Sequence, residues 1–579
     1  MMFKRLLLPA LLFTIFVFAT PPAIAFEIST SPVRVAFTGL KTAGQEFGDV
    51  TLVVDPKTGE TTSADRLPEL ISPTAVSWTA ATVTFSFKVF ETTYFFSWAI
   101  GDSLLSDTRM TADLPETSGF LGELERFQIG KALLSGGKMT VSEGVGDQPQ
   151  VTEFTLLHQA VNLEDVAEGR IGKLTAGAMA LAGDIRDRQE QMTLSLNIER
   201  TTAAGFDLAY PAVAFSSTLS DFSPDLPTAE YLRTFDNYAK AGLGYDSLSL
   251  EAITAVAVLN EKRYSLSIDS NHNGLYRGYV AGPGSLNGLK LDAGTTGIVS
   301  VNSITATGYD LTAAADDIRE RLRTRPEIFD PEVTDPSVFL SSLPALDFGD
   351  FSVSGVMISE GDKSLTLATV LVDDIRIDAD HRINFGFKID SLALPASLFN
   401  KQRDKTTRKI LDYAGLDQLK INLEHHFTLD PKDWGLSINS LDVAMDGLAA
   451  FTSQLELTGL ALPKDDGNFV YPRLAKAGIT ISNDQLLDAG LASAASGNRT
   501  PDYLRREAEQ TLRNLQASMT TEPGKAVYDE VIKFLNGTPV LSMSLAPQNP
   551  VPLDQVGGIL ALSADAAVQF LGLKVTASP

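Results

Sequence analysis

The sequence predicts a mainly β protein (α+β), built from curved antiparallel sheets with a few helices. Three observations lead to this fold class. Apolar and polar residues alternate with a period of two over many short segments, as in strands with one buried face. Strings rich in Gly, Asp, Asn and Pro separate these segments, as turns do. Two stretches about 170 residues apart also repeat one pattern, which predicts two related units in tandem.

The first 25 residues have the layout of a secretory signal peptide. Lys4 and Arg5 precede an apolar stretch, and Ala23-Ile-Ala25 forms an A-x-A cleavage site before Phe26. The alternative is an uncleaved membrane anchor, but the apolar stretch is short for one and has prolines within and after it. We therefore expect residues 1–25 to be removed, and no transmembrane segment to remain, because no later apolar run reaches about 18 residues.

The composition indicates the cellular compartment of the protein and excludes some classes of binding partner. An exported protein without a single cysteine must be held together by its core, which favours the periplasm of a Gram-negative bacterium. The formal charge is −25, and −27 once Lys4 and Arg5 are removed. Such a polyanion repels nucleic acid and anionic lipid headgroups, so we expect neither nucleic-acid binding nor electrostatic docking on a membrane.

The segment from 26 to 170 reads as an N-terminal β-rich domain. Val83, Phe85, Phe87 and Val89 alternate with polar residues as in a half-buried strand, and residues 92–100 follow as a hairpin partner. Further strands are expected in "KMTVSEG" and "VTEFTLLHQAV".

Helices are few. Apolar residues at helical spacing predict helices over 228–241, 311–324, 396–414, from 501 onward, and 523–535. The clearest begins at Thr500, a natural N-cap, with Pro501 in the first helical position. The string "TPVLSMSLAPQNPVPL" predicts a closing strand that runs into an extended proline stretch.

Self-similarity predicts a duplication. Asp246 and Leu248 correspond to Asp417 and Leu419, and "SLSIDS" (265–270) corresponds to "GLSINS" (435–440), with a predicted helix before each stretch. We therefore expect α+β repeat units over 171–345 and 346–520, followed by a C-terminal helix and closing strand over 521–579. The alternative is chance similarity between two amphipathic hairpins.

The string from Asp269 to Gly274 fits the first half of a calcium loop. Position 9 of the loop would be Arg277 and position 12 would be Val280, neither of which can ligate calcium. The flanking residues alternate like strands, so we interpret Asn273-Gly274 as a turn between strands.

Other residue types that could carry chemistry are scattered. His425 and His426 are adjacent on a predicted strand and should face opposite sides of a sheet. His158, His272 and His381 are isolated, and the acidic string 372–382 reads as a strand, a polar turn and the next strand rather than as a cation site. We therefore expect no metal site and no cofactor.

Catalytic motifs are also missing from the sequence. It contains no G-x-S-x-G elbow, no S-x-x-K set with its partner motifs and no P-loop, so we assign no catalytic residue and expect a non-enzymatic protein. Two predicted helices are rich in Lys and Arg, around 319–325 and 401–409. Each reads as a solvated outer face, or alternatively as a surface that docks on an anionic partner.

Long meanders with a helix at the start of each unit resemble, in overall organisation, the AsmA-like group of periplasmic repeat-β proteins. The resemblance implies lipid handling and transfers no residue. The sequence thus leads to two hypotheses. The first is a non-catalytic cell-envelope protein that binds an apolar ligand such as lipid, or an envelope protein partner, along its sheets. The alternative is a periplasmic hydrolase with an unrecognised active site.

Overall fold

The computed structural model describes most of the chain after the expected signal peptide. The described residues are 28–42, 45–54, 61–63, 75–89, 92–110, 127–145, 148–187, 190–207, 244–259, 262–294, 297–325, 343–361, 363–400, 405–432, 434–460 and 472–579. The signal peptide and the predicted helix over 228–241 lie outside these residues.

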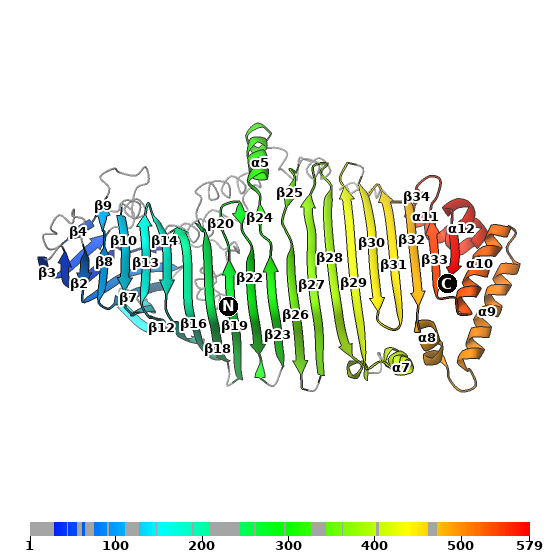
Figure 1. Ribbon diagram of the computed structural model, residues 1–579, viewed down its shortest axis with the longest axis horizontal. Coiled ribbons are helices and arrows are strands. Elements are labelled where there is room, and N and C mark those ends of the chain that lie inside the picture. The colour runs from blue at the N-terminus through cyan, green and yellow to red at the C-terminus, as the bar shows by residue number, and fades with distance from the viewer. Residues whose placement is uncertain are drawn as a thin grey trace. The chain divides into compact units, whose positions relative to one another are not determined.

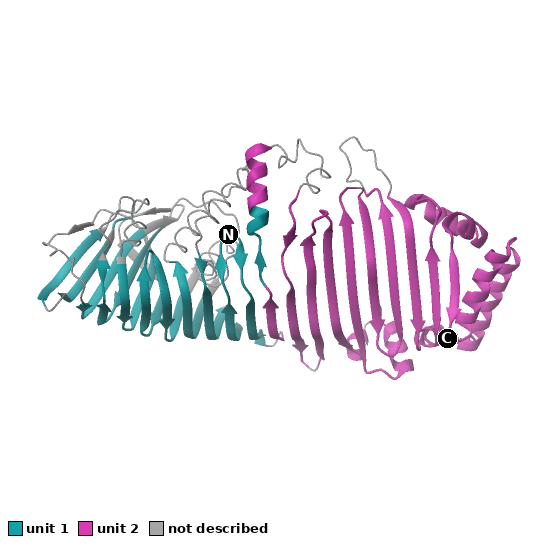
Figure 2. Ribbon diagram, turned by 45° about the horizontal axis from the view of Figure 1, so that its top comes forward, with its two compact units in different colours: residues 1–294, 308–315 teal, residues 295–307, 316–579 magenta. Residues whose placement is uncertain are grey.

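The described chain is mostly β, with large antiparallel sheets, and it divides into two compact units. Unit 1 comprises residues 1–294 and 308–315, and unit 2 comprises residues 295–307 and 316–579, as coloured in Figure 2. The mainly β class is therefore confirmed.

Unit 1 is built almost entirely of strands. They are β1 (Ile28–Thr30), β2 (Val33–Thr42), β3 (Gln45–Val54), β4 (Thr61–Ser63), β5 (Val76–Trp78), β6 (Ala80–Val89), β7 (Thr92–Ile100), β8 (Ser103–Ser106), β9 (Arg109–Met110), β10 (Phe127–Leu134), β11 (Gly137–Val145), β12 (Gln148–His158), β13 (Val161–Ala167), β14 (Arg170–Ala176), β15 (Met179–Asp187), β16 (Glu190–Asp207), β17 (Gly244–Tyr245), β18 (Ser247–Leu259), β19 (Lys262–Asn273), β20 (Tyr276–Arg277), β21 (Val280–Ala281), β22 (Gly284–Asp292) and β24 (Tyr309–Asp310).

The long strand β16 joins two branches of sheet. Its first half pairs with β15, which leads through β12, β11, β7 and β6 to β2. Its second half pairs with β14, which leads through β13, β10, β8 and β5 to the same strand β2. The two branches therefore meet at β16 and again at β2.

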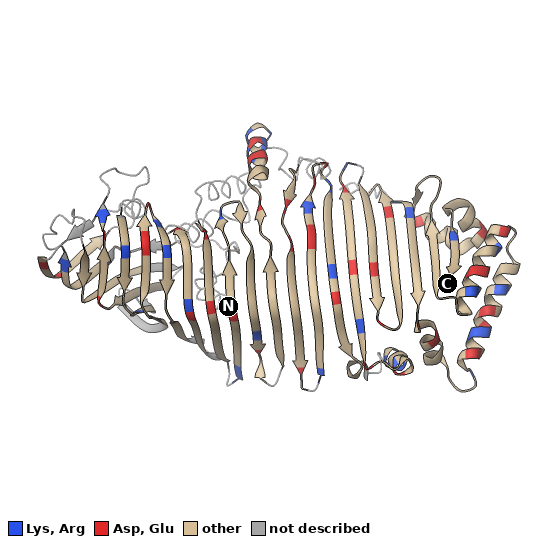
Figure 3. Cartoon of the chain, in the orientation of Figure 1, with Lys and Arg blue, Asp and Glu red and all other residues tan. Residues whose placement is uncertain are grey.

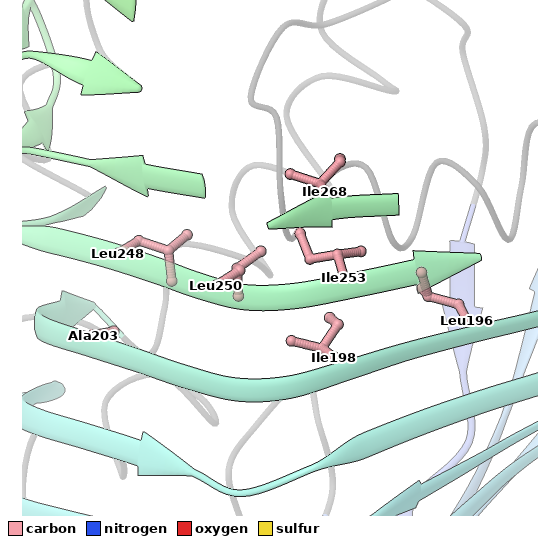
Figure 4. Packing of buried hydrophobic residues seen from close by; sticks show 7 residues of the cluster. All are labelled: Leu196, Ile198, Ala203, Leu248, Leu250, Ile253 and Ile268. Carbon is pink, nitrogen blue, oxygen red and sulfur yellow. The ribbon is translucent and has the colours of Figure 1, made fainter. Parts of the chain in front are cut away.

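The core of unit 1 lies where these branches come together. Near β16, the buried side chains come from β16, β18 and β19 and are shown in Figure 4: Leu196, Ile198, Ala203, Leu248, Leu250, Ile253 and Ile268. Leu174 of β14 and Leu181 of β15 pack against them. Near β2, Ile100 on one branch is buried with Trp78, Leu105 and Leu134, which belong to the other branch. Alternating apolar residues in unit 1 are thus buried between strands of the two branches.

A small hairpin follows the Asn-Gly string that resembled a calcium loop. Gly274 N–H donates to the carbonyl of Pro283 (2.8 Å), so the two chain segments still run side by side beyond Asn273. The chain reverses later, at Gly278 (φ +58°), between β20 and β21. The predicted turn was therefore placed too early, because the Asn-Gly pair continues the ladder instead of closing it.

Unit 2 consists of an antiparallel sheet and several helices. Its strands are β23 (Ile298–Ala306), β25 (Leu346–Asp347), β26 (Phe351–Glu360), β27 (Lys363–Ile377), β28 (Ile383–Pro395), β29 (Gln418–Asp430), β30 (Gly435–Met445), β31 (Ala449–Thr458), β32 (Arg473–Asn483), β33 (Val540–Leu545), β34 (Val551–Pro552) and β35 (Lys574–Ser578). Neighbours pair in the order β23, β26, β27, β28, β29, β30, β31, β32, β33 and β35. Figure 1 shows these strands side by side.

The helices predicted over 311–324, from 501 onward and over 523–535 are confirmed, the one predicted over 396–414 is described in two parts, and others were missed. They are α5 (Thr312–Thr324), η3 (Ala396–Asn400), α7 (Lys405–Ala414), α8 (Leu486–Ala494), α9 (Pro501–Ala517), α10 (Glu522–Leu535), α11 (Leu553–Leu562) and α12 (Ala564–Leu571). Thr500 caps α9, since its hydroxyl accepts from Tyr503 N–H at 3.2 Å. The helices α8, α11 and α12 were not predicted, because their short apolar stretches also suit buried strands.

The predicted domain boundaries and the duplication stay predictions. The boundary at residue 170 falls inside the hairpin of β13 and β14. In each proposed repeat, the strand after the matched aspartate begins directly behind it: β18 follows Asp246, and β29 follows Asp417.

Candidate apolar binding face

Cross-strand pairing in unit 2 collects apolar residues on one face of its sheet. We name each row of cross-strand neighbours on this face after its member in β29. The row of Leu423 crosses all ten paired strands: Ile304, Val353, Val370, Ile389, Leu423, Val443, Phe451, Ile481, Leu541 and Ala577.

Four further rows run parallel to this one. The row of Ile421 contains Val356, Leu367, Leu392, Ile421, Met445 and Ala449. The row of His425 contains Phe351, Val372, Phe387, His425, Leu441, Ser453, Ile479, Met543 and Val575. The row of Phe427 contains Phe385, Phe427, Ile438, Leu455, Ala477 and Leu545. The row of Leu429 contains Leu346, Ile377, Ile383, Leu429, Leu436, Leu457, Leu474 and Val551. We call these five rows the apolar face.

Bulges keep the apolar residues in phase. In β28 the alternation shifts by one residue between Ile389 and Leu392, and the register against β29 shifts at the same place. In β30 the alternation shifts between Ile438 and Leu441, again at a register shift. In both strands the next apolar residue comes three positions later instead of two. The extra residue at the bulge turns the chain over by one position and so brings that residue back to the apolar face.

The centre of the apolar face is not covered by a second layer of described structure. Every residue in the row of Leu423 is only half-buried except Leu541, and Phe351 is 42% exposed. With strands about 4.8 Å apart and same-face residues about 6.8 Å apart, the five rows between β27 and β32 have a flat footprint of roughly 650 Å², which includes the parts that helices cover. The half-buried centre of the face, away from the covered parts, is the candidate binding surface.

Helices cover two parts of the face. Leu411 of α7 and Leu448 are buried against Leu419 and Met445, at the ends of β29 and β30. Val556 of α11 and Leu571 of α12 are buried with Leu457 and Leu474, on β31 and β32. The remaining surface between these two clusters is the candidate site.

The opposite face of the sheet is polar. Glu424 lies 3.7 Å from Lys388 and 3.5 Å from His426, and Arg382 lies 3.3 Å from Asp430. Figure 3 shows single charged residues on the strands and a high density of charge on α9 and α10.

The histidines lie in different surroundings. His425 pairs across strands with Phe387 and Leu441 on the apolar face, while His426 pairs with Gly386 and Ser440 on the polar face. The Nδ1 atom of His425 is enclosed and has no hydrogen-bond partner among the described residues.

In unit 1, His158 is buried and accepts at Nε2 from Trp98 Nε1–H (2.8 Å). In unit 2, His381 Nδ1 lies 2.7 Å from the carbonyl of Leu343. The contact that most resembles a nucleophile with its base is Ser249 Oγ to His272 Nδ1, at 2.6 Å. These two residues are cross-strand partners. The backbone amides around them are hydrogen-bonded in the ladders that β18 forms with β16 and β19. Amides engaged in a ladder are not free to stabilise an oxyanion.

The acidic string 372–382 forms a strand and a turn. Both Asp380 N–H and Arg382 N–H donate to Asp378 Oδ1, at 2.9 Å each. Burial by itself would raise the pKa of Asp378, but these backbone hydrogen bonds and Arg382 outweigh it and lower the pKa. Among the described residues, no group of three or more Asp, Glu or His side chains could hold a metal ion.

The two basic helices differ in how far their charge is neutralised within the helix. On α5, Arg319, Arg321 and Arg323 pair with Asp316, Asp317 and Glu320. On α7, Arg408 lies 2.8 Å from Asp412. The ion pairs of α5 favour a solvated outer face over a docking surface for anionic partners.

Comparisons with known proteins add little. A family model described as "Uncharacterized protein" matches residues 436–578, the part of unit 2 from β30 to β35. No curated protein matches the chain. The crystal structure of the siderophore receptor PiuA from Acinetobacter baumannii aligns with 10% identity over 80% of this chain and 76% of that chain. Its TM-score of 0.11 is too low to support an argument about fold or function. Within the described part of the chain, no helix has both the length and the apolar character needed to cross a membrane.

Proposed function

We propose that this protein is a non-catalytic, exported cell-envelope protein that binds lipid acyl chains along the apolar face of unit 2. The observation that carries the proposal is the set of five apolar rows whose centre stays half-buried among the described residues. Covering such a surface is favourable by about 25 cal/mol for each Å² of apolar area removed from water.

The size of the face favours a small ligand over a second copy of the chain. A stable protein–protein interface buries about 800 Å² on each partner, which is more than the whole footprint of roughly 650 Å² with its helix-covered parts included. The polar face supplies the solvated side that a single-layer sheet needs.

The test measures binding of diphenylhexatriene, an apolar fluorescent probe, to the full chain. Phe451 on the apolar face and Thr452 beside it on the opposite face provide a matched pair on β31. We expect Phe451→Lys to weaken probe binding by about tenfold or more, since a charge replaces an apolar contact. Thr452→Lys, which adds the same charge to the polar face, should change it less than about twofold.

Ile481→Lys and Thr480→Lys repeat this comparison on β32, in case Phe451→Lys fails to fold. Native mass spectrometry of protein purified in the presence of membranes should show lipid adducts on the wild type. Clean spectra together with no probe binding would refute the proposal, as would equal losses in both members of each pair.

The hydrolase alternative is supported only by the close contact of Ser249 and His272. Hydrolysis of p-nitrophenyl esters by the wild type, lost in Ser249→Ala, would favour it. We expect no such activity, because the pair lies on a strand ladder without an arrangement of free backbone donors.

A further inference from the structure

His425 interrupts the apolar face near its centre. Its cross-strand neighbours are Phe387 and Leu441, and its ring centroid lies 5.7 Å from that of Phe427. Within the described part of the chain, no hydrogen bond reaches its enclosed Nδ1 atom. A buried polar atom without a hydrogen-bond partner destabilises the fold, and such atoms are rare in native proteins.

Among the described residues of the neighbouring strands, none supplies a counter-charge for this imidazole on the apolar face. The same-face residues of β28 and β30 that surround it are Phe385, Phe387, Ile389, Ile438, Leu441 and Val443. The nearest charged residues in the register, Lys388 and Glu424, face the opposite side, where they pair with each other at 3.7 Å. An anion on the apolar face would therefore meet one imidazole and no carboxylate among these neighbours.

The two nitrogens of a histidine ring differ in their reach. Nδ1 is nearer the backbone, whereas Nε2 is at the tip of the ring and is the nitrogen better placed to reach a molecule lying on the face. With Nδ1 enclosed and unbonded, the tautomer that carries its proton on Nε2 avoids an orphaned N–H donor. That tautomer presents an N–H to an acceptor oxygen.

We propose that His425 is the head-group contact for a long-chain fatty acid, whose acyl chain lies along the apolar rows. Nε2–H of His425 donates a hydrogen bond to a carboxylate oxygen of the ligand. The inference rests on the proposed function and specifies its ligand class. A hydrogen bond to a charged group contributes about 1.5–3 kcal/mol, so the carboxylate should bind about tenfold or more tightly than an uncharged head group on the same chain.

The experiment measures displacement of diphenylhexatriene from the full chain by palmitate, hexadecanol and hexadecyl phosphate. The wild type should prefer palmitate to hexadecanol by about tenfold. His425→Phe, which keeps an aromatic ring of similar size, should bind the probe as the wild type does but lose the preference. His425→Gln places an amide N–H near the position of Nε2 and should restore most of it.

The outcomes separate the two proposals. A wild type without any preference for palmitate, or a preference that His425→Phe retains, would overturn the role of His425 while probe binding remains. Tighter binding of hexadecyl phosphate than of palmitate would overturn the assignment to a carboxylate. A wild type that does not bind the probe at all would instead refute the proposed acyl-chain site.

Discussion

The carboxylate of Glu530 on α10 accepts a hydrogen bond from the backbone N–H of Ala577 on β35, at 2.7 Å. The strand β35 pairs with β33 on its other side, so Glu530 takes up a backbone donor that would otherwise be free at the sheet edge. Unpaired edge donors are templates for aggregation, and a helix that covers an edge removes this hazard. The pKa of Glu530 is lowered by its hydrogen bond to Lys533 and by the Ala577 amide.

We expect Glu530→Ala to free this edge amide. Hydrogen exchange at Ala577 should accelerate by about tenfold or more, because a charge-assisted hydrogen bond is lost. Asp529→Ala removes a neighbouring acid without this bond and should leave exchange at Ala577 unchanged. Equal exchange in both variants would show that Glu530 does not protect the edge.

Gly355 occupies a left-handed conformation (φ +62°) in the middle of β26. A side chain there would collide with that of Asn302 on β23. Gly361 has the same φ in the turn after β26, but a side chain there would meet no atom nearby. We expect Gly361→Ala to cost about 1 kcal/mol of unfolding free energy from the backbone alone, and Gly355→Ala to cost clearly more. Denaturant unfolding of the two variants provides the comparison, and equal costs would argue against the collision.

Asp565 ties α12 to the start of α10. Its carboxylate accepts from the hydroxyl and backbone N–H of Thr520 and of Thr521. The hydroxyl of Thr521 is the largest cause that lowers the pKa of Asp565, from 3.8 to about 2. Because the folded pKa lies below the unfolded value, this group stabilises the fold fully above about pH 4, and that stabilisation is lost as the pH falls through about 2.

Asp565→Asn should therefore lower the melting temperature at neutral pH. Between pH 4 and pH 2 the melting temperature of the variant should fall less than that of the wild type. Thermal unfolding of the two proteins across this range is the measurement. A variant whose melting temperature falls as steeply as that of the wild type would contradict the assignment.

His158 and His272 test the difference between a buried and an exposed histidine. His158 accepts from Trp98 Nε1–H inside unit 1, whereas exposed His272 contacts Ser249. We expect His158→Phe to lower the free energy of unfolding by about 1–3 kcal/mol, since it leaves the indole N–H without its partner. His272→Phe should change the free energy by less than about 0.5 kcal/mol. Urea unfolding followed by tryptophan fluorescence distinguishes the two, and a similar loss in both would contradict this account.

Local pattern predicted much of the fold. The alternation around Val83 became β6, and Thr500 with Pro501 became the start of α9, because side-chain periodicity and capping act within a few residues. The shorter helices α11 and α12 were missed because their apolar stretches do not distinguish helix from strand. The Asn273-Gly274 turn was misplaced because ladder pairing with Gly284 extends the hairpin past it.

The sequence by itself determined which residues of each strand share a face, since alternation with period two is a local property. His425 and His426 were separated to opposite faces by this property alone. Only the tertiary structure decided what covers each face. In unit 1 the two branches that meet at β16 and β2 bury side chains such as Ile100, whereas in unit 2 the face that includes Leu423 and Val443 stays half-buried. Covering a face requires pairings between strands distant in the chain, and their long-range geometry is not encoded in any single alternating segment.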